Sequence, residues 1–357
     1  MKRTISRAVP AALMLTLALT ACGESGSTES GATDAGVTGS IKGMGASSQQ
    51  AAVVSWKAAF EGANSGVTVD YDPQGSGAGR AQFADGAVDF AGTDSAFKDE
   101  ELDKAKEACG GDIVQVPVYV SPIAVIYHLE GVDKLQLSPD TLAKIMDRKI
   151  TKWDDAAIKA DNPGVDLPST AIATVNRSDD SGTTKNFVEY LGKAAPDAWS
   201  YEPEDKWPVS GGNAAKGTSG VVDAVKRGQG TIGYADFSQA KDVGVASLKV
   251  GDEYVEPSAE SAAKILDASK AKSESETDLA VDVAKDTKEA GVYPNVLVSY
   301  QAACLKYKDA EKAKVVKAWL EYVAGEEGQK AAADAAGSAP LPASWIEKNK
   351  AAIDKIS

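Results

Sequence analysis

Residues 171–191, AIATVNRSDDSGTTKNFVEYL, carry a strand pattern, a polar turn and the start of a helix in direct succession. The first five residues of this stretch are small or β-branched and predict a short strand. Phe187 and Leu191 lie at helical spacing and predict the apolar face of the following helix. The turn between them, residues 176–184, is rich in hydroxyls and contains an arginine. This order predicts a unit of an α/β fold whose turn lies at the carboxyl end of a strand, where ligands usually bind.

Two other turns repeat this pattern of small residues and hydroxyls ahead of a helix. Residues 43–48, GMGASS, precede a helix whose predicted buried face includes Val53, Trp56 and Phe60. Residues 75–80, GSGAGR, follow a predicted strand and precede a short helix. Each of the three turns therefore joins small residues and hydroxyls to the start of a helix.

Such turns have the chemistry of anion sites. The first N–H groups of a helix have no internal acceptor, and the helix dipole adds about half a positive charge there. Glycine lets the backbone approach an anion closely, and hydroxyls add hydrogen-bond donors. A single turn of this kind is more often an ordinary cap than a ligand site. Three of them in one chain, including one that carries Arg177, predict that an anion is bound.

Strand and helix patterns alternate along the rest of the chain. This alternation predicts an α/β architecture with largely parallel sheets that are covered by helices on both faces. Residues 256–291 are acidic and weakly helical, and they predict a surface helix pair with a loop near 273–277. Val315, Val316, Trp319 and Leu320 predict a packed helix near the C-terminus. The predicted strands lie at 67–71, 87–91, 113–126, 171–175 and 231–234.

The composition of the chain and the absence of several common motifs argue against some classes of function. The chain has 357 residues, a formal net charge of −14 and one histidine. This charge argues against nucleic acid and anionic lipid as partners, and a single histidine disfavours His-rich zinc sites. The sequence lacks the G-x-x-x-x-G-K-[ST], the strand-associated G-x-G-x-x-G and the G-x-S-x-G patterns of common nucleotide-binding proteins and esterases. We therefore expect no metal, no cofactor and no catalytic residue.

The N-terminus has the pattern of an export signal. Residues 1–21 contain a basic start and a short apolar run, and they end in Leu-Thr-Ala before Cys22, which resembles a bacterial lipobox. We expect cleavage before Cys22 and a lipid on its sulfur; the alternative is an ordinary signal peptide. Residues 22–40 have the composition of a flexible tether. Cleavage would remove three basic residues and take the charge from −14 to −17.

Two cysteines remain in the body of the chain. Cys109 and Cys304 would lie in an oxidising compartment after export, where a disulfide forms readily. The alternative is a pair of buried thiols.

Six motifs occur in an order that resembles a known family. The most specific is the R-x-D-x-S-G-T turn at 177–183. Together, from about residue 41 to the C-terminus, they resemble the phosphate-binding protein of bacterial ABC phosphate importers. The motifs are GMGASS at 43–48, GSG at 75–77, DFAGTD at 89–94, KWDD at 152–155, RSDDSGT at 177–183 and GTIGY at 230–234.

The resemblance implies a fold, partners and a place in the cell. The expected fold is α/β and two-lobed, like periplasmic binding proteins, with a mixed, mostly parallel sheet and flanking helices in each lobe. Phosphate would lie in the cleft between the lobes. The protein would be a monomer, anchored by its lipid to the outer face of the cell membrane. Its partners would be phosphate and the transmembrane subunits of an ABC permease with a cytoplasmic ATPase.

The resemblance also implies a ligand shell drawn from the turns and from one further aspartate. The family more often has Thr and an aromatic residue where this chain has Ser47 and Ser48, so Ser48 would contribute its N–H or its hydroxyl. The expected phosphate-binding residues are Ser47, Ser48, Ser76, Asp94, Arg177, Asp179, Ser181, Gly182 and Thr183.

Three of these residues have distinct expected roles. Arg177 would offer its planar fork to two phosphate oxygens, and Asp179 would fix the orientation of that fork. Asp94 would accept a hydrogen bond from a protonated phosphate and repel sulfate, which carries no proton at neutral pH.

The chain is expected to cross between lobes near 118–122 and to return near 250–255. Lobe 1 would then comprise residues 41–120 and 255–357, and lobe 2 residues 121–254. The competing hypotheses are a receptor for sulfate or molybdate, a secreted phosphoesterase that uses Ser76 or Ser181 as nucleophile, and a surface adhesin.

Overall fold

The structure is a computed structural model that describes residues 36–357, except for the side chains of residues 266–268. The expected signal peptide, Cys22 and most of the expected tether lie outside the described residues. Strand β1 begins at Gly39, two residues before the body was expected to start. No helix among the described residues is long and apolar enough to cross a membrane.

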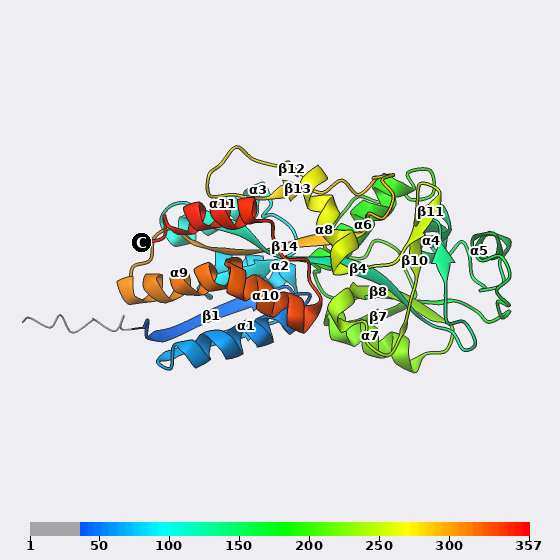
Figure 1. Ribbon diagram of the computed structural model, residues 1–357, viewed down its shortest axis with the longest axis horizontal. Helices are drawn as coiled ribbons and strands as arrows, with labels where there is room; N and C mark the ends of the chain where they lie inside the picture. Colours follow the sequence, from blue (N-terminus) through cyan, green and yellow to red (C-terminus); the bar gives the residue numbers. More distant parts are fainter. Residues whose placement is uncertain (1–35) are drawn as a thin grey trace, which may run out of the picture. The chain divides into compact units, whose positions relative to one another are not determined.

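A nine-stranded mixed sheet forms the centre of the fold (Figure 1). Its strands follow the order β2-β1-β3-β14-β4-β8-β6-β7, and β9 also pairs with β4. Their bounds are β2 Val67–Asp72, β1 Gly39–Gly45, β3 Phe90–Thr93, β14 Val296–Cys304, β4 Ile113–His128, β8 Thr231–Asp236, β6 Ala173–Arg177, β7 Asn213–Ala215 and β9 Gly244–Val245.

Parallel strands form both ends of the main sheet. At one end β1 pairs in parallel with β2 and β3, and at the other end β6 pairs in parallel with β7 and β8. The long strands β14 and β4 lie between these groups and pair with their neighbours in antiparallel fashion. The expected α/β fold with mixed sheets is therefore confirmed. In the main sheet, however, the parallel pairings do not outnumber the antiparallel ones, because β4 and β14 pair with all their neighbours in antiparallel fashion.

Strand β4 connects the two halves of the sheet. Its first part, through Pro122, pairs with β14, and its second part, from Ile123, pairs with β8. All of its residues are buried except His128, which is partly exposed. A register shift in β14 lies between Ser299 and Tyr300. Such bulges bend a strand and re-aim its side chains, and this one lies beside the site described below.

Helices cover both faces of the sheet because adjacent strand residues point to opposite faces. In the first half, Phe90 packs against Trp319 of α9 with the two rings tilted, whereas Ala91 packs in a separate cluster with Phe83 of α2. The helices are α1 Gln50–Ala63, α2 Ser76–Ala84, α3 Asp99–Cys109, α4 Pro139–Met146, α5 Ala156–Asp161, α6 Gly182–Ala194, α7 Gly217–Arg227, α8 Ala259–Ala268, α9 Ala310–Ala324, α10 Glu326–Ala336 and α11 Ala343–Ile353.

The predicted apolar faces of two helices are confirmed. Val53, Trp56 and Phe60 of α1 are buried, as are Trp319 and Leu320 of α9. Trp56 and Phe60 both form edge contacts with Trp319. These aromatic contacts fix α1, and with it the turn that precedes α1, against the sheet.

The predicted helix pair at 256–291 is wrong in its second half. After α8 the chain forms two short paired strands, β12 Lys270–Ala271 and β13 Val281–Asp282, and then runs irregularly to β14. Val281 and Val283 are buried against the rest of the protein. Tertiary packing has therefore overridden a weak helical pattern. The remaining small sheet consists of β5 Gln136–Leu137, β10 Ser247–Val250 and β11 Glu253–Val255.

Candidate functional site

Asp94 lies where several chain segments meet. It directly follows β3, and its side chain is 3% exposed. Its backbone N–H donates to the Ser76 hydroxyl over 3.1 Å. Its carboxylate accepts hydrogen bonds from three hydroxyl groups: Ser48 at 2.6 Å, Ser299 at 2.6 Å and Thr183 at 2.9 Å. These donors stabilise a buried negative charge, which would otherwise be costly.

The N-terminus of α6 approaches Asp94 closely because residue 182 is glycine. A Cβ atom at Gly182 would lie 2.6 Å from the Ser76 hydroxyl oxygen and 2.7 Å from the Asp94 Cβ. Any side chain here would force these segments apart. Ser181 caps the helix, since its hydroxyl accepts from the Thr184 N–H over 3.1 Å. The N–H groups of Gly182 and Thr183 belong to the first turn, which has no intrahelical acceptors.

Arg177 at the end of β6 is held by Asp179. The guanidinium Nε donates to Oδ1 of Asp179 over 2.8 Å, and Nη2 donates to Oδ2 over 2.5 Å. Arg177 is 3% exposed. Burial raises the pKa of Asp179, but the hydrogen bonds and charge of Arg177 outweigh it, so the pKa lies below its usual range. This two-point pair fixes the plane of the guanidinium.

Ser47 joins the turn before α1 to the start of α7. Its hydroxyl lies 3.0 Å from the Thr218 hydroxyl and accepts from the Thr218 N–H over 3.1 Å. Arg177 Nη1 lies 3.5 Å from the same Thr218 hydroxyl. Ser47, Thr218 and Arg177 therefore form a continuous polar contact from one half of the sheet to the other.

The site combines fixed donors with an acceptor and suits an oxyanion. Two helix N-termini, hydroxyls and a buried guanidinium supply donors, while the Asp94 carboxylate only accepts hydrogen bonds. Among the described residues, no group of three or more His, Cys, Asp or Glu side chains is placed to hold a metal ion.

Comparisons with known proteins support this assignment. A family model described as a PBP superfamily domain matches residues 30–327. The chain is 35% identical to phosphate-binding protein PstS 2 of Mycobacterium tuberculosis over 358 aligned residues, which covers 96% of each chain. It is also 35% identical to phosphate-binding protein PstS 3 of Mycobacterium leprae, covering 89% of this chain and 87% of that one. This chain belongs to the PstS family of phosphate-binding proteins.

Solved structures share the PstS-type fold. The periplasmic phosphate-binding protein PfluDING, solved with bound phosphate, superimposes with a TM-score of 0.72 at 23% identity. The alignment covers 88% of this chain and 93% of that chain. A structural match at 23% identity shows a shared fold and nothing more. The resemblance to the family and the predicted fold are both confirmed.

The structure gathers the residues expected for a PstS ligand shell. Contacts join the four stretches around residues 47, 76, 94 and 177–183 rather than scattering them over separate surfaces. Asp179 is half-buried. The buried members are Ser47, Ser48, Ser76, Asp94, Arg177, Ser181, Gly182 and Thr183.

Sequence reasoning missed several residues that contact this shell, among them Thr218 and Ser299. Thr218 follows β7 and opens α7, so it lies in a fourth strand-to-helix turn that carries a hydroxyl. That pattern could have revealed it. Ser299 lies inside the buried strand β14, where no local pattern distinguishes a serine that contacts Asp94 from a serine of the core.

A second buried arginine lies near the shell but is neutralised by other groups. Arg80 of α2 pairs with Asp205 and, over 2.8 Å, with Glu101. It also donates to the Thr93 hydroxyl over 3.0 Å. Arg80 therefore supports the turn that carries Asp94, while its charge is balanced by two carboxylates.

Cys109 and Cys304 form a disulfide with a Cα–Cα distance of 5.4 Å. The bond joins the end of α3 to the end of β14.

Proposed function

We propose that this chain binds inorganic phosphate between the two halves of its sheet and delivers it, outside the cytoplasm, to an ABC permease for import. The observation that carries the proposal is the meeting of Ser48, Thr183 and Ser299 at Asp94, next to the N-termini of α2 and α6. The curated relatives are phosphate-binding proteins, so we propose a receptor rather than an enzyme.

In this proposal the phosphate oxygens accept from groups that are already fixed. The first-turn N–H groups of Gly182 and Thr183 on α6 would donate to the anion, and the helix dipole would favour its charge. Arg177 supplies a full positive charge, and Asp179 holds it in place. Hydrogen bonds to charged groups contribute about 1.5–3 kcal/mol each, so several of them support micromolar or tighter binding.

Asp94 would select phosphate over sulfate. An ionised carboxylate accepts hydrogen bonds and cannot donate one. Phosphate keeps a proton at neutral pH and can donate to Asp94, whereas sulfate has none and would be repelled. The hydroxyls of Ser48, Ser299 and Thr183 keep the carboxylate in a fixed orientation.

Closure of two lobes would trap the ligand. We propose lobe 1 as residues 41–120 and 255–357 and lobe 2 as residues 121–254, and the change of partner along β4 at Pro122 supports the first boundary. The contacts that join the proposed lobes at the site include Ser47 to Thr218, Thr183 to Asp94, and the Gly77 N–H to the Asp180 carbonyl over 3.1 Å. Opening would break these contacts and release phosphate.

The proposal also includes a lipid anchor on the protein and a permease that receives the phosphate. The Leu-Thr-Ala-Cys sequence ending at Cys22 supports lipid attachment at the outer face of the membrane. Growth with a labelled fatty acid should label the wild-type protein and leave Cys22→Ala unlabelled; label in both variants would contradict the assignment.

Titration calorimetry with phosphate, arsenate and sulfate tests the central proposal. We expect phosphate to bind with a Kd of about 1 μM or below, and sulfate to give no measurable heat. Arsenate, which is also protonated near neutral pH, should compete with phosphate. Equal binding of phosphate and sulfate would contradict the role of Asp94, and absence of phosphate binding would contradict the function.

A further inference from the structure

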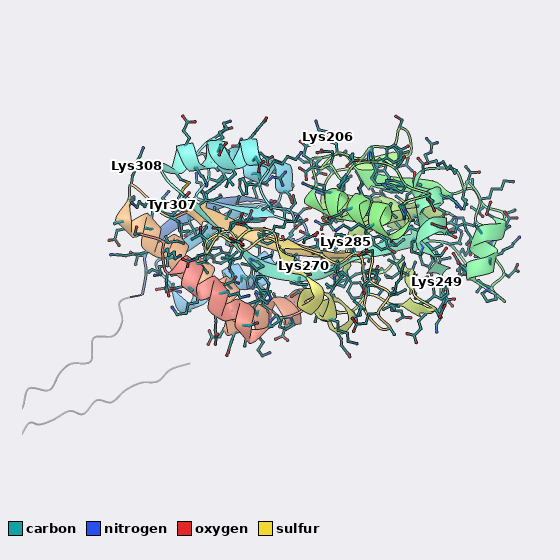
Figure 2. All side chains as sticks on the ribbon, turned by 90° about the horizontal axis from the view of Figure 1, so that it is seen from above. Lys206, Lys249, Lys270, Lys285, Tyr307 and Lys308 are labelled. Atoms are coloured by element: carbon teal, nitrogen blue, oxygen red, sulfur yellow. A yellow bond between two sulfur atoms is a disulfide. The ribbon has the colours of Figure 1, made fainter. Side chains whose placement is uncertain are left out.

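Lys285 is a buried lysine that none of the sequence motifs singled out. It lies in the irregular segment between β13 and β14, and it is 0% exposed. Figure 2 labels it near the centre of the described body. Its ammonium group donates to the Val296 carbonyl over 2.6 Å and to the side-chain oxygen of Asn186 over 2.9 Å.

No carboxylate within ion-pair distance of this ammonium occurs among the described residues. A buried charge without an opposite charge is costly, and proteins usually pair such groups. Its two hydrogen-bond partners, a carbonyl and an amide oxygen, satisfy donors but do not neutralise the charge. Within the part of the chain that the structure describes, the ammonium therefore has no carboxylate paired with it, although the protein is strongly negative overall.

Asn186 connects Lys285 to the phosphate site. Its side-chain nitrogen donates to the backbone carbonyl of Asp94 over 2.6 Å and to the backbone carbonyl of Gly182 over 3.0 Å. Lys285 holds the oxygen of the same amide, which fixes how the amide is oriented. The residues on either side of the proposed site, Asp94 and Gly182, are thus held by one amide that Lys285 orients.

We propose that Lys285 is a positioning residue of the phosphate site and its second fixed positive charge, acting through Asn186 on Asp94 and Gly182. This inference rests on the proposed function. Bound phosphate would be the missing counter-charge, because it would lie on the other side of the Asn186 link. Lys285 would therefore strengthen phosphate binding without touching the ligand.

The charge around Lys285 gives this role a pH signature. The charged groups facing the ammonium are Glu189 and Lys193 from α6, Lys272 after β12 and Asp282 on β13, two of each sign. Burial lowers the pKa of Lys285 to about 8. A bound phosphate dianion favours the charged form and raises that pKa again. The contribution of Lys285 to affinity is then complete below about pH 8 and is lost as the pH rises through the pKa of the bound form.

Four proteins test the inference: wild type, Lys285→Met, Lys285→Arg and Lys270→Met. Lys270 is exposed, so its variant is a control with the same change in net charge. At about pH 7.5 we expect Lys285→Met to bind inorganic phosphate about tenfold more weakly than wild type, which corresponds to a shift of one pKa unit. Lys270→Met should match wild type, and Lys285→Arg should restore most of the loss.

The same titrations at about pH 10 separate positioning from a merely structural role. Wild-type affinity should fall toward that of Lys285→Met, whereas the affinity of Lys285→Arg should stay high because arginine keeps its charge. Equal affinity of wild type and Lys285→Met at both pH values would overturn the inference while leaving phosphate binding intact. A loss that does not change with pH and is not restored by arginine would also overturn it. If wild type and Lys270→Met do not bind phosphate at all, the proposed function fails, and the assignment of Lys285 with it.

Discussion

Ser299 donates a hydrogen bond to Asp94 over 2.6 Å, although 205 residues separate them in the chain. The Ser299 hydroxyl also accepts from the side-chain nitrogen of Gln49 over 2.7 Å. Gln49 precedes the first helix, Asp94 follows β3, and Ser299 lies at the bulge in β14. One serine on a central strand therefore connects two of the turns that form the proposed site.

Replacing Ser299 with alanine should weaken phosphate binding. The variant loses one of three hydroxyl donors to a buried carboxylate, a hydrogen bond of about 1.5–3 kcal/mol. We expect a Kd about tenfold or more above wild type in titration calorimetry. Ser55→Ala on α1 is the control, because it loses a hydrogen bond to Ala331 outside the site. Equal affinities for all three proteins would remove Ser299 from the ligand shell.

Arg177→Ala should cause a larger loss than Ser299→Ala. It removes the charge that would face the anion and the two hydrogen bonds that Asp179 accepts. We expect phosphate affinity to fall by about hundredfold or more, since the two charge-assisted hydrogen bonds that the arginine would donate to phosphate are lost. Arg177→Lys keeps the charge without the planar fork and should bind with intermediate affinity. An alanine variant that still binds as wild type does would show that the arginine serves only the fold.

The sequence predicted the turns of the site because their chemistry is local. Residues 43–48 and 177–183 both carry glycine and hydroxyls ahead of a helix, and the second stretch also has Arg177; these features depend on neighbours in the chain. The contacts of Ser299 and Thr218 depend on how distant segments pack. A hydroxyl inside a buried strand has no such local signature, so Ser299 could not be distinguished from core.

Packing also explains where the secondary-structure prediction failed. The stretch after α8 has weak helical character, but Lys285 and Val283 are buried there against α6 and the central strands. Burial of a charged side chain within an irregular segment follows from the tertiary fold. No pattern in the sequence of residues 269–291 points to it.

Asp94→Asn should reduce the discrimination against sulfate. An asparagine amide can donate as well as accept, and it carries no charge to repel a fully ionised anion. We expect sulfate to compete measurably with phosphate in the variant, while wild type ignores it. Competition titrations with both anions at neutral pH measure this directly. A variant that still rejects sulfate would mean that another feature of the site makes the selection.

Asp236 should make the stability of the protein depend on pH between about pH 4 and about pH 7. It ends β8, is 0% exposed, and its Oδ1 accepts from the Tyr119 hydroxyl over 2.9 Å and from Ser238, whereas its Oδ2 has no partner. Burial raises the pKa of Asp236 to about 7, against 3.8 for an ordinary aspartate.

The folded protein holds the proton of the Asp236 carboxyl more tightly than the unfolded chain does. The stabilisation of the fold by this protonated carboxyl is therefore complete below the pKa of 3.8 in the unfolded chain, and it is lost as the pH rises to about 7. The contribution of Asp236 to the thermal midpoint of ligand-free wild type should therefore fall between about pH 4 and about pH 7, and Asp236→Asn should flatten that dependence. Thermal melts followed by circular dichroism at several pH values test this, with Asp242→Asn as an exposed control. If Asp236→Asn and Asp242→Asn show the same pH profile as wild type, Asp236 is not the group that titrates. If only the pH profile of Asp236→Asn is flat, the buried carboxyl at the junction of β4 and β8 is protonated in the folded protein at mildly acidic pH.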